Sequence, residues 1–169
     1  DRIAEVINPL DVKIVVNIQA DEPLIHPTMI DSLARALLED NSVSMATIMK
    51  RIDDPVLIND SNVVKVVTDK NNFALYFSRS VIPYAAANSD VKEPQYFKHI
   101  GLYGYTKDFL FIFKNLPVSD LERSEKLEQL RVLEEGFKIK VIETKFDTIG
   151  IDTPDDLLKV EEYFKKEAI

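Results

Sequence analysis

The sequence predicts an α/β protein in which a mostly parallel sheet, with an inserted hairpin, is flanked by helices. Three observations support this class. Residues 12–18 form an apolar, β-branched run of the kind found in strands that are buried on both faces. Segments with helical spacing alternate with such runs along the chain. A polar turn at residues 70–72 separates two extended segments and indicates the hairpin.

The first half of the chain supplies a strand, a helix, a second strand and the hairpin. After the strand at 12–18, residues 26–40 carry apolar side chains at helical spacing, and Pro27 lies where the first turn of a helix tolerates proline. Residues 44–52 predict the next strand. The hairpin strands are expected within two segments, 62–69 and 71–79.

The second half begins with a loop between Pro83 and Pro94 and then returns to regular structure. Residues 98–106 predict a strand, and a helix follows for which Thr106 is a suitable N-cap. Residues 119–136 carry a leucine stripe and predict one long amphipathic helix that Gly136 ends. The remaining segments predict a strand at 138–145 and a capped helix at 153–169.

Composition narrows the class of function. With 169 residues the chain suits a single domain, 1–169. Its 21 basic and 29 acidic residues give a net charge of −8, which disfavours nucleic acid as the main partner. The absence of cysteine excludes disulfides and thiol catalysis. No apolar run approaches the ~20 residues that span a bilayer. We therefore expect a cytoplasmic protein without membrane insertion.

Two aspartates lie where ligands bind in open α/β sheets, beyond the carboxyl ends of strands. Asp21 follows the first predicted strand, and Asp152 lies between the last strand and the last helix. Magnesium takes one or two carboxylates and completes its shell with phosphate oxygens and water. Spacing alone favours an ordinary structural explanation for each: Asp21 ends a strand, and Asp152 precedes a helix N-terminus, where negative charge is favourable.

Several polar residues elsewhere could also face a ligand. Gln19 ends an apolar strand, where its amide is satisfied either by backbone or by a bound molecule. Arg79 could clamp a carboxylate or phosphate with two hydrogen bonds, or form a surface ion pair. Taken alone, His99 is better explained as a satisfied histidine at the edge of the core. Glu128 and Gln129 would by default lie on the solvated face of the predicted helix.

Six blocks in sequence order resemble the 3-deoxy-manno-octulosonate cytidylyltransferase (CMP-KDO synthetase) family, and they extend over almost the whole chain. They are VVNIQADEPLI, NVVKVV, ALYFSRSVIPY, HIGLYGY, LEQLRVLEEG and GIDTPDDL. The resemblance implies a nucleotide-diphospho-sugar-transferase (Rossmann-like) fold and a homodimer. It also implies formation of CMP-KDO and pyrophosphate from CTP and 3-deoxy-manno-octulosonate (KDO), with Mg²⁺, for the inner core of lipopolysaccharide.

The same resemblance assigns roles to individual residues. It implies that Asp21 and Asp152 are the catalytic metal ligands, which hold magnesium against the triphosphate. It places Arg2 near the nucleotide. The residues expected to surround the sugar acid, with the Arg79 guanidinium on its carboxylate, are Gln19, Arg79, His99, Glu128 and Gln129.

The resemblance begins where family members have already passed their phosphate-binding loop. The four glycines of this chain form no such loop. We therefore expect a C-terminal portion of the enzyme, incomplete at its N-terminus and inactive without the preceding segment. Two alternatives stay open. One is a related sugar nucleotidyltransferase, such as one resembling CMP-sialic acid synthetase. The other is a noncatalytic module for binding or dimerisation.

Overall fold

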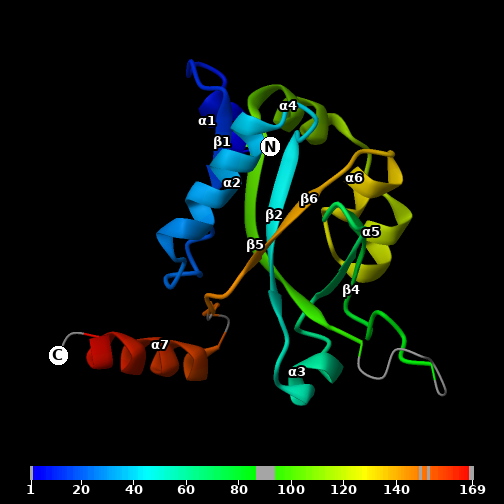
Figure 1. Cartoon of the computed structure of the whole chain (residues 1–169). Coiled ribbons are helices and arrows are strands. Elements are labelled where there is room, and N and C mark those ends of the chain that lie inside the picture. Colours follow the sequence, from blue (N-terminus) through cyan, green and yellow to red (C-terminus); the bar gives the residue numbers. More distant parts are fainter. Residues whose placement is uncertain (1, 87–93, 149, 152, 168–169) are drawn as a thin grey trace.

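A computed structural model describes residues 2–86, 94–148, 150–151 and 153–167. Its strands form one sheet in the order β4-β3-β5-β2-β6, and β1 pairs with β5 (Figure 1). The strands match the predicted segments closely, because each of those segments carries the apolar pattern of a buried strand. Their bounds are β1 Ile14–Asn17, β2 Met45–Arg51, β3 Lys65–Thr68, β4 Ala74–Ser78, β5 Phe97–Thr106 and β6 Lys140–Thr144.

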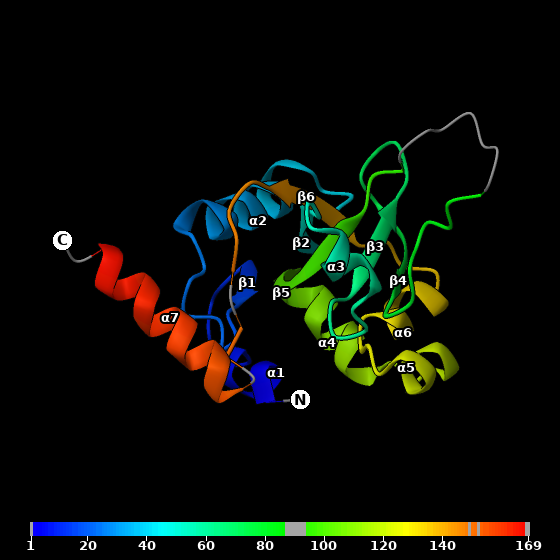
Figure 2. The same ribbon diagram turned by 90° about the horizontal axis from the view of Figure 1, so that it is seen from below.

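Helices lie on both sides of the sheet. Figure 2 shows α2 on one side, with α1, α4, α5 and α6 on the other. In Figure 1, α7 extends away from the sheet. The bounds are α1 Arg2–Ile7, α2 Pro27–Glu39, α3 Pro55–Asn59, α4 Lys107–Asn115, α5 Asp120–Glu125, α6 Leu130–Glu134 and α7 Pro154–Glu167. The short helices α1 and α3 were not predicted.

Local caps explain several helix boundaries. Thr106 precedes α4, and its side chain accepts a hydrogen bond from the backbone N–H of Phe109, as expected of an N-cap. Pro27 occupies the first turn of α2 and Pro154 begins α7. Gly136 follows α6 with a φ of +79°, in the left-handed region that favours glycine.

The sheet is not mostly parallel, which corrects the prediction. Within the described strands only β2 and β6 pair in parallel, whereas β5 runs antiparallel to β1, β2 and β3. The β3–β4 hairpin is antiparallel, as predicted. Alternating strands and helices predict a parallel sheet only where each connection is a crossover that returns the chain in the same direction. Here the long strand β5 returns between β2 and β3 in the opposite direction, so the central pairings are antiparallel.

The core consists of two apolar layers, one on each face of the sheet. Alternate side chains of β2 supply both: Met45 and Met49 enter the layer that includes Phe77 and Leu130, whereas Ile48 enters the other. The second layer lies under α2, whose buried residues are Met29, Leu33 and Leu37. Burial on both faces explains why β2 begins with a nearly continuous apolar run.

The edge of β5 has a gap that positions the candidate site. β1 pairs with residues 103–106 of β5, and β3 pairs with the same strand at Lys98. Both lie on the edge opposite β2, because Tyr103 and Lys98 also pair with β2. Among the described residues no strand pairs with this edge between them. The backbone N–H of His99 donates to the carbonyl oxygen of Val64, and the carbonyl oxygen of Gly101 accepts a hydrogen bond from Gln19, whereas the side chains of Ile100 and Leu102 are buried in the core. On the β2 side the register shifts there, between Thr47 and Ile48, which marks a bulge.

The segment 119–136 is not one long helix, which corrects a second prediction. Helix α5 ends at Glu125, and Lys126 adopts a left-handed conformation, with a φ of 58° and a ψ of 42°. Helix α6 starts only at Leu130. Leu127 is buried and the Glu125 carboxylate is bonded to β4, so tertiary contacts hold the chain in a turn that the leucine spacing alone does not predict. Glu128 and Gln129 therefore lie between two helices.

Candidate functional site

A cleft opens at the gap along the edge of β5, and we call it the edge cleft. Its volume is about 480 Å³. Five residues predicted to surround a sugar acid line it together, namely Gln19, Arg79, His99, Glu128 and Gln129. They come from the end of β1, the end of β4, strand β5 and the turn between α5 and α6. Other lining residues include Asn62, Val63, Val64, Lys98, Gly101, Tyr103 and Thr148.

Gln19 reaches the cleft across the sheet edge. Its side-chain Nε2 donates a hydrogen bond to the carbonyl oxygen of Gly101 at 3.3 Å. A Cβ atom at position 101 would lie 3.2 Å from that nitrogen, so glycine permits this close approach. The amide of Gln19 is thus anchored on one side by backbone, and its oxygen can accept a hydrogen bond from a ligand hydroxyl.

Arg79 is held by main-chain groups. Its Nε donates to the carbonyl oxygen of Glu125 at 2.9 Å, and its Nη1 donates to the carbonyl oxygen of Ser61 at 3.0 Å. Within the described residues Arg79 makes no ion pair, so the surface salt bridge considered from the sequence is not found there. A cation held by neutral carbonyls retains its full charge for an anionic ligand.

His99 is an uncharged hydrogen-bonding group at neutral pH. Burial lowers the pKa of His99 to about 3. Its Nε2 lies 2.9 Å from Oγ1 of Thr47, whose hydroxyl also faces the carbonyl oxygens of Ile100 and Leu102 at 3.2 and 3.0 Å. If the single Thr47 hydroxyl proton goes to a carbonyl, Nε2–H donates to Thr47, and Nδ1 is then an acceptor. A group with this pKa is poorly matched to general base catalysis near pH 7.

Glu128 and Gln129 differ in environment. The Glu128 side chain is 68% exposed, and its carboxylate lies 3.4 Å from Nη2 of Arg131. Gln129 is only 6% exposed. In the described part of the chain its Nε2 has no hydrogen-bond partner, although the atom is buried. Burying an amide donor without a partner costs free energy. An acceptor on a ligand in the edge cleft would remove that cost.

The structure describes only one of the two predicted metal ligands. Asp21 is exposed, and its carbonyl oxygen accepts a hydrogen bond from the backbone N–H of Ile151 at 2.8 Å. This brings the loop after β1 beside the loop before α7, at the rim where Gly150 lines the edge cleft. Asp152 lies outside the described residues. Arg2 is the first residue of α1, and its side chain is likewise not described.

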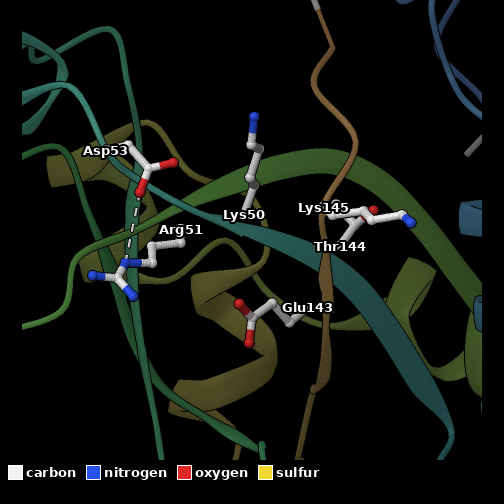
Figure 3. A pocket seen from close by; sticks show the side chains of 6 residues that line it. All are labelled: Lys50, Arg51, Asp53, Glu143, Thr144 and Lys145. Carbon is white, nitrogen blue, oxygen red and sulfur yellow. Dashed lines mark ion pairs between the residues drawn. The ribbon is translucent and has the colours of Figure 1, made fainter.

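A larger hollow of about 610 Å³ contains none of the predicted residues. Its lining side chains are Lys50, Arg51, Asp53, Glu143, Thr144 and Lys145 (Figure 3). Lys50 and Arg51 project from opposite sides of β2, as successive residues of a strand do. Arg51 lies 3.7 Å from Asp53, and Lys50 pairs with Asp147 at 2.7 Å. Lys50 and Arg51 already form ion pairs, and they do not point toward a common ligand position. The edge cleft is therefore the better candidate despite its smaller volume.

The part of the chain that the structure describes contains no group of three or more metal-ligating side chains that could hold a metal ion, and none of its helices is long and apolar enough to span a membrane. Magnesium does not require such a group, because phosphate oxygens and water complete its coordination shell.

Sequence reasoning missed two charged residues that shape the cleft. Lys65 is fully buried in β3, and Glu125 ends α5 against β4. The sequence does contain a signal for Lys65, which lies within the apolar run VVKVV. A lysine buried in such a run needs polar partners, because lysine is almost never fully buried unless it is paired. Glu125 lies in a charged segment where no local pattern distinguishes it from its exposed neighbours.

Comparisons with known proteins agree on one family. A family model described as "Cytidylyltransferase" matches residues 1–141. A 3-deoxy-manno-octulosonate cytidylyltransferase of Solibacter usitatus is 52% identical over 98% of this chain and 65% of its own length. One from Pelobacter propionicus is 50% identical over 98% of this chain and 68% of its own length. The chain thus spans about two thirds of these relatives.

A solved structure gives the same result for the fold. The CMP:2-keto-3-deoxy-manno-octonic acid synthetase, complexed with CTP, superposes with a TM-score of 0.90 and 36% sequence identity. The match covers 99% of this chain and 68% of that one. The likeness accounts for the mixed sheet flanked by helices.

Proposed function

Because the chain belongs to the cytidylyltransferase family, we propose that it transfers a cytidylyl group from CTP to KDO, with release of pyrophosphate. The observation that carries this proposal is the edge cleft, which gathers five polar residues that the family resemblance associates with the acidic sugar. The relatives with about 50% identity bear the name of this activity.

The cleft offers groups of the right chemistry for KDO. The Arg79 guanidinium can bind the carboxylate of the sugar. Gln19, His99, Glu128 and Gln129 offer acceptors and donors for its hydroxyls. In the reaction, the anomeric hydroxyl oxygen attacks the α-phosphorus of CTP and the bond to the bridging oxygen breaks. Pyrophosphate leaves with the bonding electrons, and the hydroxyl proton passes to solvent. Such a transfer depends on positioning and charge stabilisation more than on a protein nucleophile.

We propose Asp21 and Asp152 as the ligands of magnesium. Support comes from the hydrogen bond that the backbone N–H of Ile151 donates to the carbonyl oxygen of Asp21, because Ile151 directly precedes Asp152 in the sequence. Two carboxylates with phosphate oxygens fit the preferences of this ion. When bound, it would neutralise charge on the triphosphate and lower the pKa of the attacking hydroxyl. Arg2 is proposed near the nucleotide on the resemblance alone.

The family resemblance also supports proposals about context. We propose a homodimer in the cytoplasm that supplies CMP-KDO for the inner core of lipopolysaccharide. Of the rival readings, transfer to another acidic sugar such as sialic acid would use the same carboxylate clamp. The relatives favour KDO, and they favour an enzyme over a noncatalytic module.

The experiment is a pyrophosphate-release assay on the gene product that contains this chain. CTP and Mg²⁺ are supplied with KDO, with sialic acid or with a hexose phosphate. The proposal expects release with KDO and little with the other two acceptors. Release with sialic acid alone would reassign the substrate. No release with any acceptor, while a characterised KDO cytidylyltransferase is active in the same assay, would refute the proposal.

A further inference from the structure

We infer that Lys65 and Glu125 are positioning residues that aim the Arg79 guanidinium at the carboxylate of the sugar. The inference rests on the proposed function, because it assigns the anionic ligand of Arg79. An arginine side chain loses substantial rotational entropy when it is fixed in one direction. A clamp that is already held in place binds more tightly, because less of that entropy is lost on binding.

Lys65 holds the backbone of Arg79 from one side. Its Nζ donates to the carbonyl oxygens of Asp60, Val63 and Arg79 at 2.8, 2.7 and 2.6 Å. These acceptors match the three donors of an ammonium group. Desolvation lowers the pKa of Lys65, while the charges of Asp60 and Glu125 oppose that shift. Val63 lines the edge cleft, so Lys65 ties the cleft wall to the arginine.

Glu125 holds Arg79 from the other side. Its carboxylate accepts hydrogen bonds from the Ser78 hydroxyl at 2.6 Å and from the backbone N–H of Arg79 at 2.9 Å. Its own carbonyl oxygen accepts the Nε–H of Arg79. One residue therefore fixes both the main chain and the guanidinium of Arg79. Because Glu125 ends α5, it also ties β4 to the turn that carries Glu128 and Gln129.

These contacts leave part of the guanidinium for a ligand. Nε and Nη1 donate to carbonyl oxygens, whereas in the described part of the chain no hydrogen bond involves Nη2. Arg79 lines the edge cleft. The geometry therefore points to Nη2 and the second N–H of Nη1 as the two donors that bind the sugar carboxylate. Loss of the Glu125 carboxylate would release the Ser78 hydroxyl and the backbone N–H of Arg79, and loss of the Lys65 ammonium would release the Arg79 carbonyl oxygen. Either change would loosen the backbone that directs the guanidinium without changing the charge of the arginine.

Calorimetry of the gene product tests this with two sugars, KDO and its uncharged carboxamide. The variants are Glu125→Gln, Glu125→Ala, Lys65→Met and Arg79→Ala. Glu135→Ala is the matched control, because Glu135 is exposed and its side chain makes no hydrogen bond or ion pair among those the structure describes. We expect Glu125→Ala to weaken KDO binding about tenfold, the usual effect of losing a charge-assisted contact. Carboxamide binding should change little, and Glu125→Gln should retain more of the affinity.

The preference for KDO over the carboxamide separates positioning from general stability, because a purely structural defect weakens both ligands alike. In the Arg79→Ala background, Glu125→Ala should have little further effect, since the two residues act as one unit. Glu125→Gln keeps the side-chain volume and is expected to fold even if Lys65→Met does not.

Two outcomes would overturn the inference and can be told apart. If the unaltered protein binds neither sugar, the proposed function fails together with the inference. If the unaltered protein prefers KDO and Glu125→Ala keeps that preference, the inference alone is wrong.

Discussion

The backbone N–H of Ile151 donates a hydrogen bond to the carbonyl oxygen of Asp21 across 2.8 Å, and this bond joins two loops that are distant in the sequence. One loop follows the first strand and the other precedes the last helix. The bond brings Asp21 close to Ile151, the sequence neighbour of Asp152, and this supports the proposal that both aspartates bind one magnesium ion.

The first prediction concerns that site. Asp21→Asn removes a charged ligand while conserving size, so we expect pyrophosphate release at a fixed magnesium concentration to fall about 100-fold or more, as when an electrostatic stabiliser is removed. A magnesium titration of the reaction rate measures the effect. Asp31→Asn on exposed α2 is the matched control and should keep normal activity. An Asp21→Asn enzyme with most of its activity would refute the metal role.

The second prediction assigns opposite effects to one substitution. Gln129→Met replaces a buried amide, whose Nε2 finds no hydrogen-bond acceptor among the described residues, with an apolar group of similar size. The free energy of unfolding should stay equal or rise by up to about 1 kcal/mol, because an unsatisfied buried donor is removed. KDO binding should weaken, because the ligand loses its partner. Urea denaturation and calorimetry measure the two quantities. A destabilised variant with normal KDO affinity would show that the amide serves the fold instead.

The third prediction contrasts two glycines. At Gly101 an added Cβ would lie 3.2 Å from Nε2 of Gln19, so Gly101→Ala should displace that amide and weaken KDO binding. Gly136 has a φ of +79° and open space around it, so Gly136→Ala should instead destabilise the fold by about 1 kcal/mol. Its effect on binding should be small. Equal effects of both variants on affinity would contradict the role given to Gly101.

The fourth prediction concerns pH. A free histidine has a pKa of about 6.5, whereas burial lowers the pKa of His99 to about 3. Between these values the unfolded chain binds a proton that the folded chain does not. Stability should therefore fall as pH decreases from about 6.5, by up to about 1.4 kcal/mol per pH unit. His99→Gln should remove this part of the slope, as measured by urea denaturation between pH 7 and pH 4. Identical slopes for both proteins would disprove the shift.

The sequence by itself determined most of the secondary structure and the family. Helical spacing predicted α2 and a β-branched run predicted β1, because both patterns report which side chains are buried, and a polar turn between two extended segments predicted the β3–β4 hairpin. The six blocks indicated the family that the comparisons support. They also named five of the residues that line the edge cleft, although no single residue carried enough signal alone.

Only the tertiary structure decided strand direction, the break after Glu125 and the shape of the cleft. Apolar periodicity says which face of a strand is buried, but it does not say which strand lies beside it or in which direction. The reversal of β5 and the shared edge of β1 and β3 depend on hydrogen bonds between distant segments. Likewise, the contacts of Lys65 and Glu125 with Arg79 arise only when β3, β4 and α5 pack together.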